Sequence, residues 1–88
     1  MRKIEQQMLK AIQDKRNWQS GNTVVQNQGP MVVKLHGNVL GEQFNGKFHV
    51  NVQTLRNWPS PTTKSRLRAL GVDVYTRKHV TYLNGEAI

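Results

Sequence analysis

Residues 58–71 read Trp58-Pro59-Ser60-Pro61-Thr62-Thr63-Lys64-Ser65-Arg66-Leu67-Arg68-Ala69-Leu70-Gly71. This stretch predicts a short helix because it carries both a start signal and a stop signal. Ser60 is a good N-cap and Pro61 suits the first helical position, where its missing N–H costs nothing, although Thr62 is a competing N-cap. Gly71 readily takes the left-handed conformation that often ends a helix. We therefore expect a central helix of about two to three turns.

The expected central helix has one apolar face. Leu67 and Leu70 share this face, with Thr63 one turn earlier. A helix this short is marginal in water when isolated. Its leucines must therefore dock on the rest of the chain, and we expect a sheet to receive them.

The same helix is basic. Lys64 and Arg68 share one flank, and Arg66 lies on the opposite flank. No acidic residue falls between Glu42 and Asp73, so we expect no nearby charge to neutralise these cations. Arg66 and Arg68 point about 160° apart around the helix, so a flat partner cannot meet both, although a groove that embraces the helix could.

The chain outside this stretch predicts one more helix and several strands. Residues 2–16 form a helix, because apolar residues from Ile4 to Ile12 recur at helical spacing. Residues 47–52 alternate as a half-buried strand does, and Asn45-Gly46 before them is a strong hairpin signal. His36-Gly37-Asn38 makes a tight turn or a bulge within one bent strand. The other strand candidates are residues 23–25, 31–35, 39–44, 72–75 and 80–83.

This order of elements predicts an α+β fold in a single small basic domain, residues 1–88. We expect an N-terminal helix at 2–16 and a sheet-and-helix body at 23–84. The body holds an antiparallel sheet of about four to six short strands, one short central helix and a C-terminal β-hairpin.

Charge is the strongest feature of the composition. Thirteen Lys and Arg stand against five Asp and Glu, which gives a net charge of +8. Such a balance favours polyanionic partners: nucleic acid, an acidic protein surface or anionic lipid. A plain solubility role for the charge is the alternative. No apolar run approaches the roughly 18 residues that a membrane span needs, so no membrane partner is expected. The absence of cysteine fits a reducing cytoplasm.

Catalytic chemistry has little support. The five carboxylates are scattered, and His36, His49 and His79 are widely spaced, without the short spacing of zinc ligands. Residues 41–47 match G-x-x-x-x-G-K, but Phe48 stands where a phosphate-binding loop needs Ser or Thr. We therefore expect a protein that is not an enzyme and that uses no cofactor or metal.

Anion binding has better support. The start of the central helix offers free N–H groups and hydroxyls to a phosphate, although an ordinary capped helix would look the same. A second basic cluster lies in the loop between the last two strands. The candidate nucleic-acid-binding residues are Arg56, Thr62, Thr63, Lys64, Arg66, Arg68, Arg77 and Lys78. These side chains would contact phosphates, which gives salt-dependent binding with little sequence preference.

Three aromatic residues could add stacking on unpaired bases: Trp58, Tyr75 and Tyr82. Burial in the core is the alternative for each. A helix–turn–helix fits the chain badly, because the other expected helix lies some forty residues upstream. A winged arrangement fits the C-terminal third better, but it lacks a preceding helix unless residues 54–58 supply a turn of one.

Two segments of the chain resemble a family of small tailed-phage proteins. Residues 35–40 (LHGNVL) match an L-H-G-N-x-I block, and residues 62–70 (TTKSRLRAL) match a T-T-K-S-R-L-x-A-L block. The resemblance covers roughly residues 23–84, with Leu40 in place of Ile and Gly41 in place of Ala. It implies a phage origin and the host cytoplasm, and it assigns no activity and no role to any residue.

The sequence therefore supports two functions. The first is non-enzymatic binding of nucleic acid through a basic surface made by the central helix and the hairpin tip. The second is inhibition or modulation of a host protein with an acidic surface, as in host takeover or counter-defence. An oligomer is possible under either function. Under the first function, the nucleic acid is either DNA or RNA and either single- or double-stranded. The basic residues either share one face or lie on several.

Overall fold

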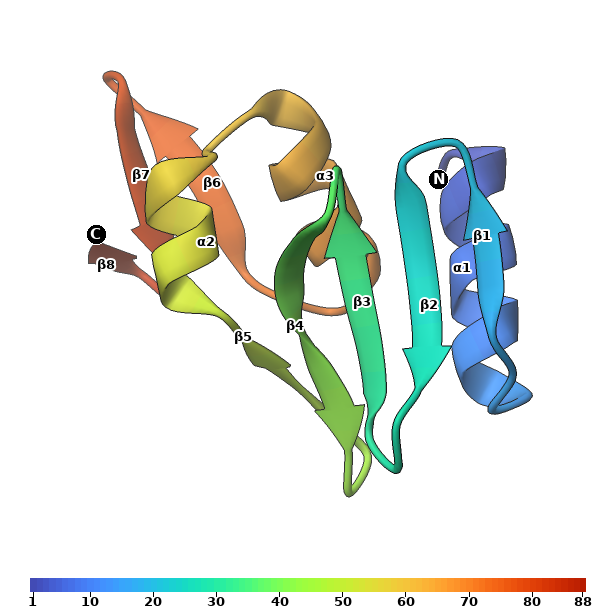
Figure 1. Cartoon of the computed structure of the whole chain (residues 1–88). Coiled ribbons are helices and arrows are strands. Elements are labelled where there is room, and N and C mark those ends of the chain that lie inside the picture. The colour runs from blue at the N-terminus through green and yellow to red at the C-terminus, as the bar shows by residue number, and fades with distance from the viewer.

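The computed structural model describes all 88 residues and contains two antiparallel sheets and three helices (Figure 1). In chain order the elements are α1 (Lys3–Gln13), β1 (Trp18–Ser20), β2 (Thr23–Asn27), β3 (Met31–Leu35), β4 (Asn38–Phe44), β5 (Lys47–Val50), α2 (Val52–Asn57), α3 (Pro61–Ala69), β6 (Val74–Arg77), β7 (Val80–Leu83) and β8 (Glu86–Ala87). The first sheet has the order β1-β2-β3-β4-β5, and the second has the order β6-β7-β8. The predicted α+β fold is confirmed.

Tight turns join neighbouring strands of the first sheet. His36 and Gly37 connect β3 to β4 with φ values of 52° and 79°, and Asn45 and Gly46 connect β4 to β5 with φ values of 52° and 74°. Positive φ at both positions is the requirement of a type I′ turn, whose twist matches that of the flanking strands. The Asn45-Gly46 hairpin is confirmed, and residues 36–37 form a turn between two strands.

A bulge lies in β4 just after the turn at residues 36–37. Val33 of β3 faces Gly41, whereas Lys34 faces Val39, so Leu40 is the extra residue. Gly41 has a φ of 154°, and a Cβ at this position would lie 2.2 Å from the carbonyl oxygen of His49. The bulge therefore requires glycine at position 41, and it turns the side chain of Leu40 into the core.

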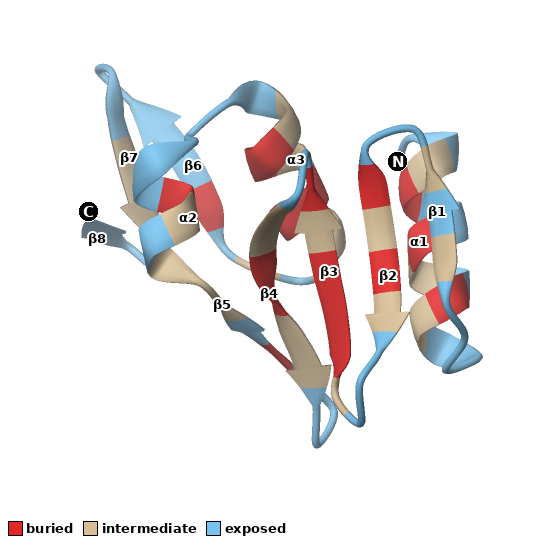
Figure 2. Ribbon diagram, viewed as in Figure 1, coloured by how far each residue is buried: buried red, intermediate tan, exposed pale blue.

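One apolar cluster connects both sheets and all three helices. It includes Met8 of α1, Val33 of β3, Leu55 of α2, Leu67 of α3 and Val74 of β6. Figure 2 shows the buried residues concentrated on β2, β3, β4 and the helices. The prediction that Leu67 docks on the rest of the chain is confirmed, since this side chain is fully buried.

The structure corrects several expected boundaries. α1 ends at Gln13, because Lys15 takes a left-handed φ of 53°, and Trp18 opens a strand that the sequence did not predict. The strand expected at 47–52 stops at Val50, because the Asn51 side chain caps a new helix by accepting a hydrogen bond from the Thr54 N–H at 3.1 Å. The short β8 extends the C-terminal hairpin to three strands.

Candidate nucleic-acid interface

The predicted central helix α3 starts as expected. The Ser60 side chain accepts a hydrogen bond from the Thr63 N–H at 3.1 Å, and Pro61 occupies the first turn. The Ser60 hydroxyl also donates to the Thr63 hydroxyl at 3.0 Å, and the Lys64 N–H donates to the Ser60 carbonyl oxygen at 3.1 Å. The Thr63 and Lys64 N–H groups both donate to Ser60, and Pro61 has no N–H. Thr62 therefore has the one N–H of this turn without a capping partner. The start of α3 therefore has the arrangement of an ordinary capped helix, in which the Thr63 and Lys64 N–H groups already serve the cap.

Arg66 is a structural residue, buried between α3 and the N-terminal part of the chain. Its Nη1 lies 2.7 Å from Glu5 Oε2 of α1, and its Nε donates to the Thr23 hydroxyl of β2 at 3.2 Å. The Ser65 hydroxyl donates to the same Glu5 oxygen at 2.6 Å. The expectation that nothing neutralises the charges of α3 was wrong, because Glu5 lies close in space although it is 61 residues away in sequence.

The Glu5 carboxyl responds to two opposing influences. Burial raises its pKa, but the hydrogen bonds from Ser65 and Arg66 and the charge of Arg66 together outweigh burial, so the pKa lies below its ordinary value of 4.5. Glu5 therefore stays ionised at neutral pH, and the Arg66 charge is compensated inside the protein.

Lys64 is also unavailable to a ligand. It is buried, and its ammonium group donates to the Thr76 hydroxyl of β6. Thr63 beside it is buried too, and Thr62 is half-buried. Of the eight candidate residues, Thr63, Lys64 and Arg66 thus lie inside the protein, where they hold α3 between α1 and β6.

The remaining candidate cations are exposed but lie in two places. Arg68 donates to the carbonyl oxygen of Val74 at 3.2 Å, at the start of β6. Arg77 and Lys78 lie at the other end of β6, about 10 Å away for a four-residue strand. The structure therefore separates Arg68 from the hairpin tip.

Arg56 does lie near the hairpin tip. A groove of about 380 Å³ is lined by Arg56 and Leu55 of α2, by Pro59, and by His79 and Val80 of the hairpin. Thr81 and Ile88 complete its lining. Arg77 and Lys78 do not line this groove, but they immediately precede His79 in the hairpin. We call the groove, together with these two flanking cations, the tip groove. The acidic residues of this half of the chain are Asp73 and Glu86. Asp73 precedes Val74, which pairs with Leu83, and Glu86 also pairs with Leu83, so both carboxylates lie at the end of the second sheet away from the tip.

The tip itself is a tight turn without glycine. Arg77 pairs with Val80, so the turn consists of Lys78 and His79, with φ values of 50° and 66°. Left-handed backbone costs roughly 1–2 kcal/mol per residue when the residue is not glycine. The hairpin bears this cost at the two residues that present cationic or titratable side chains to solvent.

The C-terminal half has the element order of a winged helix. α2 supplies the preceding helix, residues 58–60 supply the turn, α3 follows, and the β6–β7 hairpin takes the place of a wing. The packing differs from that of a DNA-reading helix, because α3 buries Lys64 against β6 and Arg66 against α1 and β2. α3 is a central brace, and the exposed cations lie on the elements around it.

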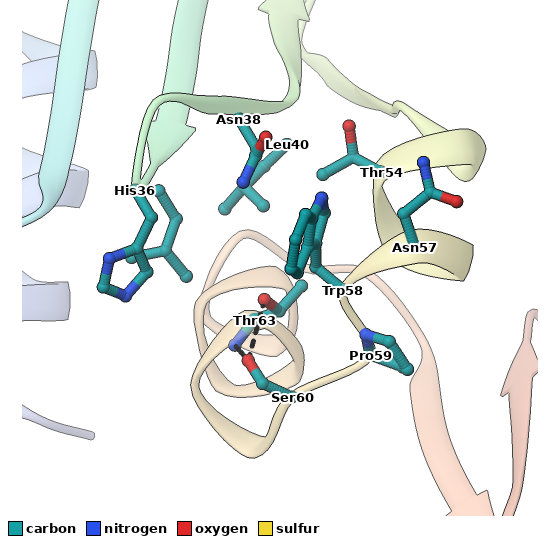
Figure 3. Close-up of a pocket in the computed structure, with 10 residues that line it drawn as sticks. His36, Asn38, Leu40, Thr54, Asn57, Trp58, Pro59, Ser60 and Thr63 are labelled. Atoms are coloured by element: carbon teal, nitrogen blue, oxygen red, sulfur yellow. Dashed lines mark hydrogen bonds between the residues drawn. The ribbon is translucent and has the colours of Figure 1, made fainter.

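A second hollow lies beside the tip groove. This Trp58 pocket has a volume of about 750 Å³ and is formed by the β3–β4 turn, α2 and the start of α3. Its lining includes Asn38, Leu40, Thr54, Asn57, Trp58 and Thr63. Figure 3 shows the Trp58 ring between Asn38 and Leu40 on one side and Thr63 on the other. Leu35, His36, Asn38 and Leu40 of the β3–β4 hairpin thus meet Thr63 of α3 at this pocket.

The three aromatic candidates have different positions. Trp58 is 56% exposed although it is among the largest apolar side chains of the chain. Tyr75 and Tyr82 stack on each other, with ring centroids 5.1 Å apart and planes 9° apart. Trp58 is therefore the aromatic side chain that lies at a pocket and is open to a ligand.

These features define a small, strongly basic α+β protein with exposed cations and an exposed tryptophan at one end. The chain belongs to the Kyanoviridae Gp96 protein family, a phage protein family, which it matches over residues 1–88. The phage origin implied by the resemblance is confirmed. Comparison with curated proteins and with solved structures gave no match. None of the three helices has the length and apolar character needed to cross a membrane.

Proposed function

We propose that this phage protein binds nucleic acid in the host cytoplasm, without catalysing a reaction, through the tip groove. The observation that carries the proposal is that Arg56 of α2 and His79 of the β6–β7 hairpin line one groove, with Arg77 and Lys78 directly before His79 in the chain. In Figure 1 the hairpin tip and the α2–α3 loop lie at the same end of the molecule. Three cations at one end, without a carboxylate among them, attract a phosphate backbone.

The internal pairing of Arg66 narrows the proposed surface. Arg66 is compensated by Glu5, and Lys64 is buried, so neither cation is available to a ligand. The other eleven Lys and Arg against four Asp and Glu leave a charge of +7 on exposed or half-buried side chains. On the α1 side, Asp14 lies 3.5 Å from Lys10 and 3.8 Å from Arg16, which reduces the attraction of that surface for phosphates. Arg68 and Thr62 lie outside the tip groove and contribute at most at long range.

Fluorescence anisotropy with labelled oligonucleotides at several salt concentrations tests the proposal. The test variant combines Arg56→Gln, Arg77→Gln and Lys78→Gln. The control combines Arg2→Gln, Lys3→Gln and Lys15→Gln, which removes the same charge from exposed positions on the α1 side.

The tip variant should lose affinity and lower the slope of log K against log salt by about 0.7 per lost contact on a single strand. The control should keep most of that slope. Equal losses in both variants would show that total charge, and not the tip groove, drives binding. No binding by the unmodified protein at about 50 mM salt, where such contacts are strong, would reject the proposal.

A second candidate function is modulation of a host protein, and the edge of the first sheet favours it. β5 pairs with β4 alone, so its other edge is open to strand addition. Phe44, in the strand that precedes β5, is a large apolar side chain that lies exposed beside this edge and stacks on His49. This function predicts a stable one-to-one complex that is pulled from host lysate and survives nuclease treatment.

A further inference from the structure

We infer that the Trp58 pocket receives one unpaired base of a strand whose phosphates lie on the tip groove. This inference rests on the proposed function and adds to it a preference for single strands. It begins from the exposure of Trp58. An indole ring that lies 56% exposed at the mouth of a pocket offers an apolar surface for stacking, and bases stack on aromatic side chains irrespective of sequence.

The polar groups of the pocket suit a neutral, planar ligand with hydrogen-bonding edges. Asn38 and Asn57 bring two amides, and Thr54 brings a hydroxyl. The Asn57 oxygen accepts a hydrogen bond from Gln53 at 3.0 Å, which leaves its NH₂ group as a donor toward a ligand. Ser60 and Thr63 bond to each other and form a wall of the pocket. Amides and hydroxyls read base edges, because they both donate and accept.

The charge distribution assigns separate roles to the two hollows. His36 is the one titratable residue that lines the Trp58 pocket, whereas Arg56 and His79 line the tip groove. A pocket without a permanent cation suits a base better than a phosphate. A groove with cations suits the phosphate that follows along the strand.

The two hollows are neighbours. Pro59 lines both, and Trp58 lies two residues from Arg56, a backbone span of at most about 7 Å. One strand that crosses Pro59 can therefore place a base against Trp58 and a phosphate beside Arg56. A base within a duplex is paired and stacked, and reaching the pocket would require flipping it out at an energetic cost. Single strands should consequently bind more tightly than duplexes of equal length.

The test compares two single-stranded probes of the same charge: a 12-residue oligothymidine and a 12-residue strand of abasic sites. Unmodified protein should bind oligothymidine about tenfold more tightly than the abasic strand, since stacking one base is typically worth that factor. Trp58→Leu should bind both strands with the weaker affinity. Trp58→Phe, which keeps an aromatic face, should restore most of the difference. The tip-groove triple variant should weaken both strands by a similar factor.

A fluorescence measurement does not depend on how well Trp58→Leu folds. In a Trp18→Phe protein, Trp58 is the one tryptophan, and oligothymidine should quench its emission while the abasic strand leaves it nearly unchanged.

Each further outcome decides the question. Equal affinity for the two probes, together with equal quenching, would overturn the base pocket and leave the tip groove standing. Binding of neither probe would overturn both proposals. Quenching by free thymidine at the same base concentration would show a small-molecule site in place of a strand site.

Discussion

Arg66 Nη1 and Glu5 Oε2 lie 2.7 Å apart in the interior of the protein and join α3 to α1. Their side chains are 7% and 3% exposed, respectively. The Ser65 and Thr23 hydroxyls supply the remaining polar partners of the pair, so no buried side-chain polar atom lacks a hydrogen bond. Such a pair resists disruption, because removing one partner leaves a charge uncompensated in a poorly solvated place.

Glu5→Ala should therefore destabilise the protein by about 3 kcal/mol, which is a large share of the total stability of a small domain. Asp14→Ala is the matched control, because it removes a carboxylate just after the same helix from two exposed ion pairs, at a cost of about 1 kcal/mol or less. Urea unfolding followed by circular dichroism measures both values. Similar losses in the two variants would contradict a structural role for the buried pair.

The lowered pKa of Glu5 makes stability depend on pH at the acid end. A carboxyl whose pKa is lower in the folded than in the unfolded state stabilises the fold above its ordinary pKa of 4.5, and this stabilisation is lost as the pH falls through the folded value. The unmodified protein should lose stability as the pH falls below about 4.5. Glu5→Gln, although less stable at neutral pH, should show a shallower acid dependence in unfolding experiments from pH 7 to pH 3. Parallel curves for the two proteins would exclude Glu5 as the source.

Gly41→Ala should be among the most destabilising single substitutions in the first sheet. The added Cβ would lie 2.2 Å from the His49 carbonyl oxygen and 2.8 Å from the Phe48 ring, at a φ of 154°. Because the clash is partly with backbone, relief requires the two strands to separate, and we expect a loss of about 3 kcal/mol or more.

Gly46→Ala provides the comparison for Gly41→Ala. Gly46 has a φ of 74°, and a Cβ added there would meet no heavy atom within 4 Å, so the substitution should lower the free energy of unfolding by about 1–2 kcal/mol. Thermal unfolding of both variants ranks them, and a larger loss at Gly46 would refute the bulge geometry.

The hairpin tip should separate stability from binding. Lys78→Asn with His79→Gly places the preferred type I′ residues at two left-handed positions and should stabilise the fold by about 1 kcal/mol. That gain corresponds to a rise in Tm of about 4–8 °C. The same variant removes a cation from the tip groove, so oligonucleotide affinity should fall while Tm rises. A rise in both Tm and oligonucleotide affinity would show that the hairpin tip is not part of the binding surface.

Features set by neighbouring residues were predictable from the sequence. The Ser60 cap, the Pro61 start of α3 and the Asn45-Gly46 turn depend on a few consecutive residues, and all three are present. A helical turn at residues 54–58 was left open, but the start of α2 at Val52 was missed because Val50 and Val52 continue the alternation of the preceding strand. Asn51 between them was read as a strand residue, although it is also a good N-cap.

The candidate site was less predictable, because burial of a cation depends on distant partners. No local signal in residues 62–70 indicates that Glu5 neutralises Arg66 or that Thr76 receives Lys64. The approach of Arg56 to His79 likewise depends on how α2 packs beside the hairpin. Trp58 was named as a stacking candidate, but the pocket beside it combines three separate segments and could not be inferred from any one of them.

The link between Glu5 and Arg66 also sets an order of events during protein synthesis. The apolar face of α1 can dock on β2 soon after that strand emerges, because residues 3–27 are consecutive parts of one unit. The first turn of α1 must wait, since Ser65 and Arg66 emerge much later. A nascent chain arrested before residue 65 would thus leave the first turn of α1 without the partners of Glu5, and it would also lack Leu67 and Val74 of the core. Proteases and chaperones would encounter that turn until the ribosome had added the central brace.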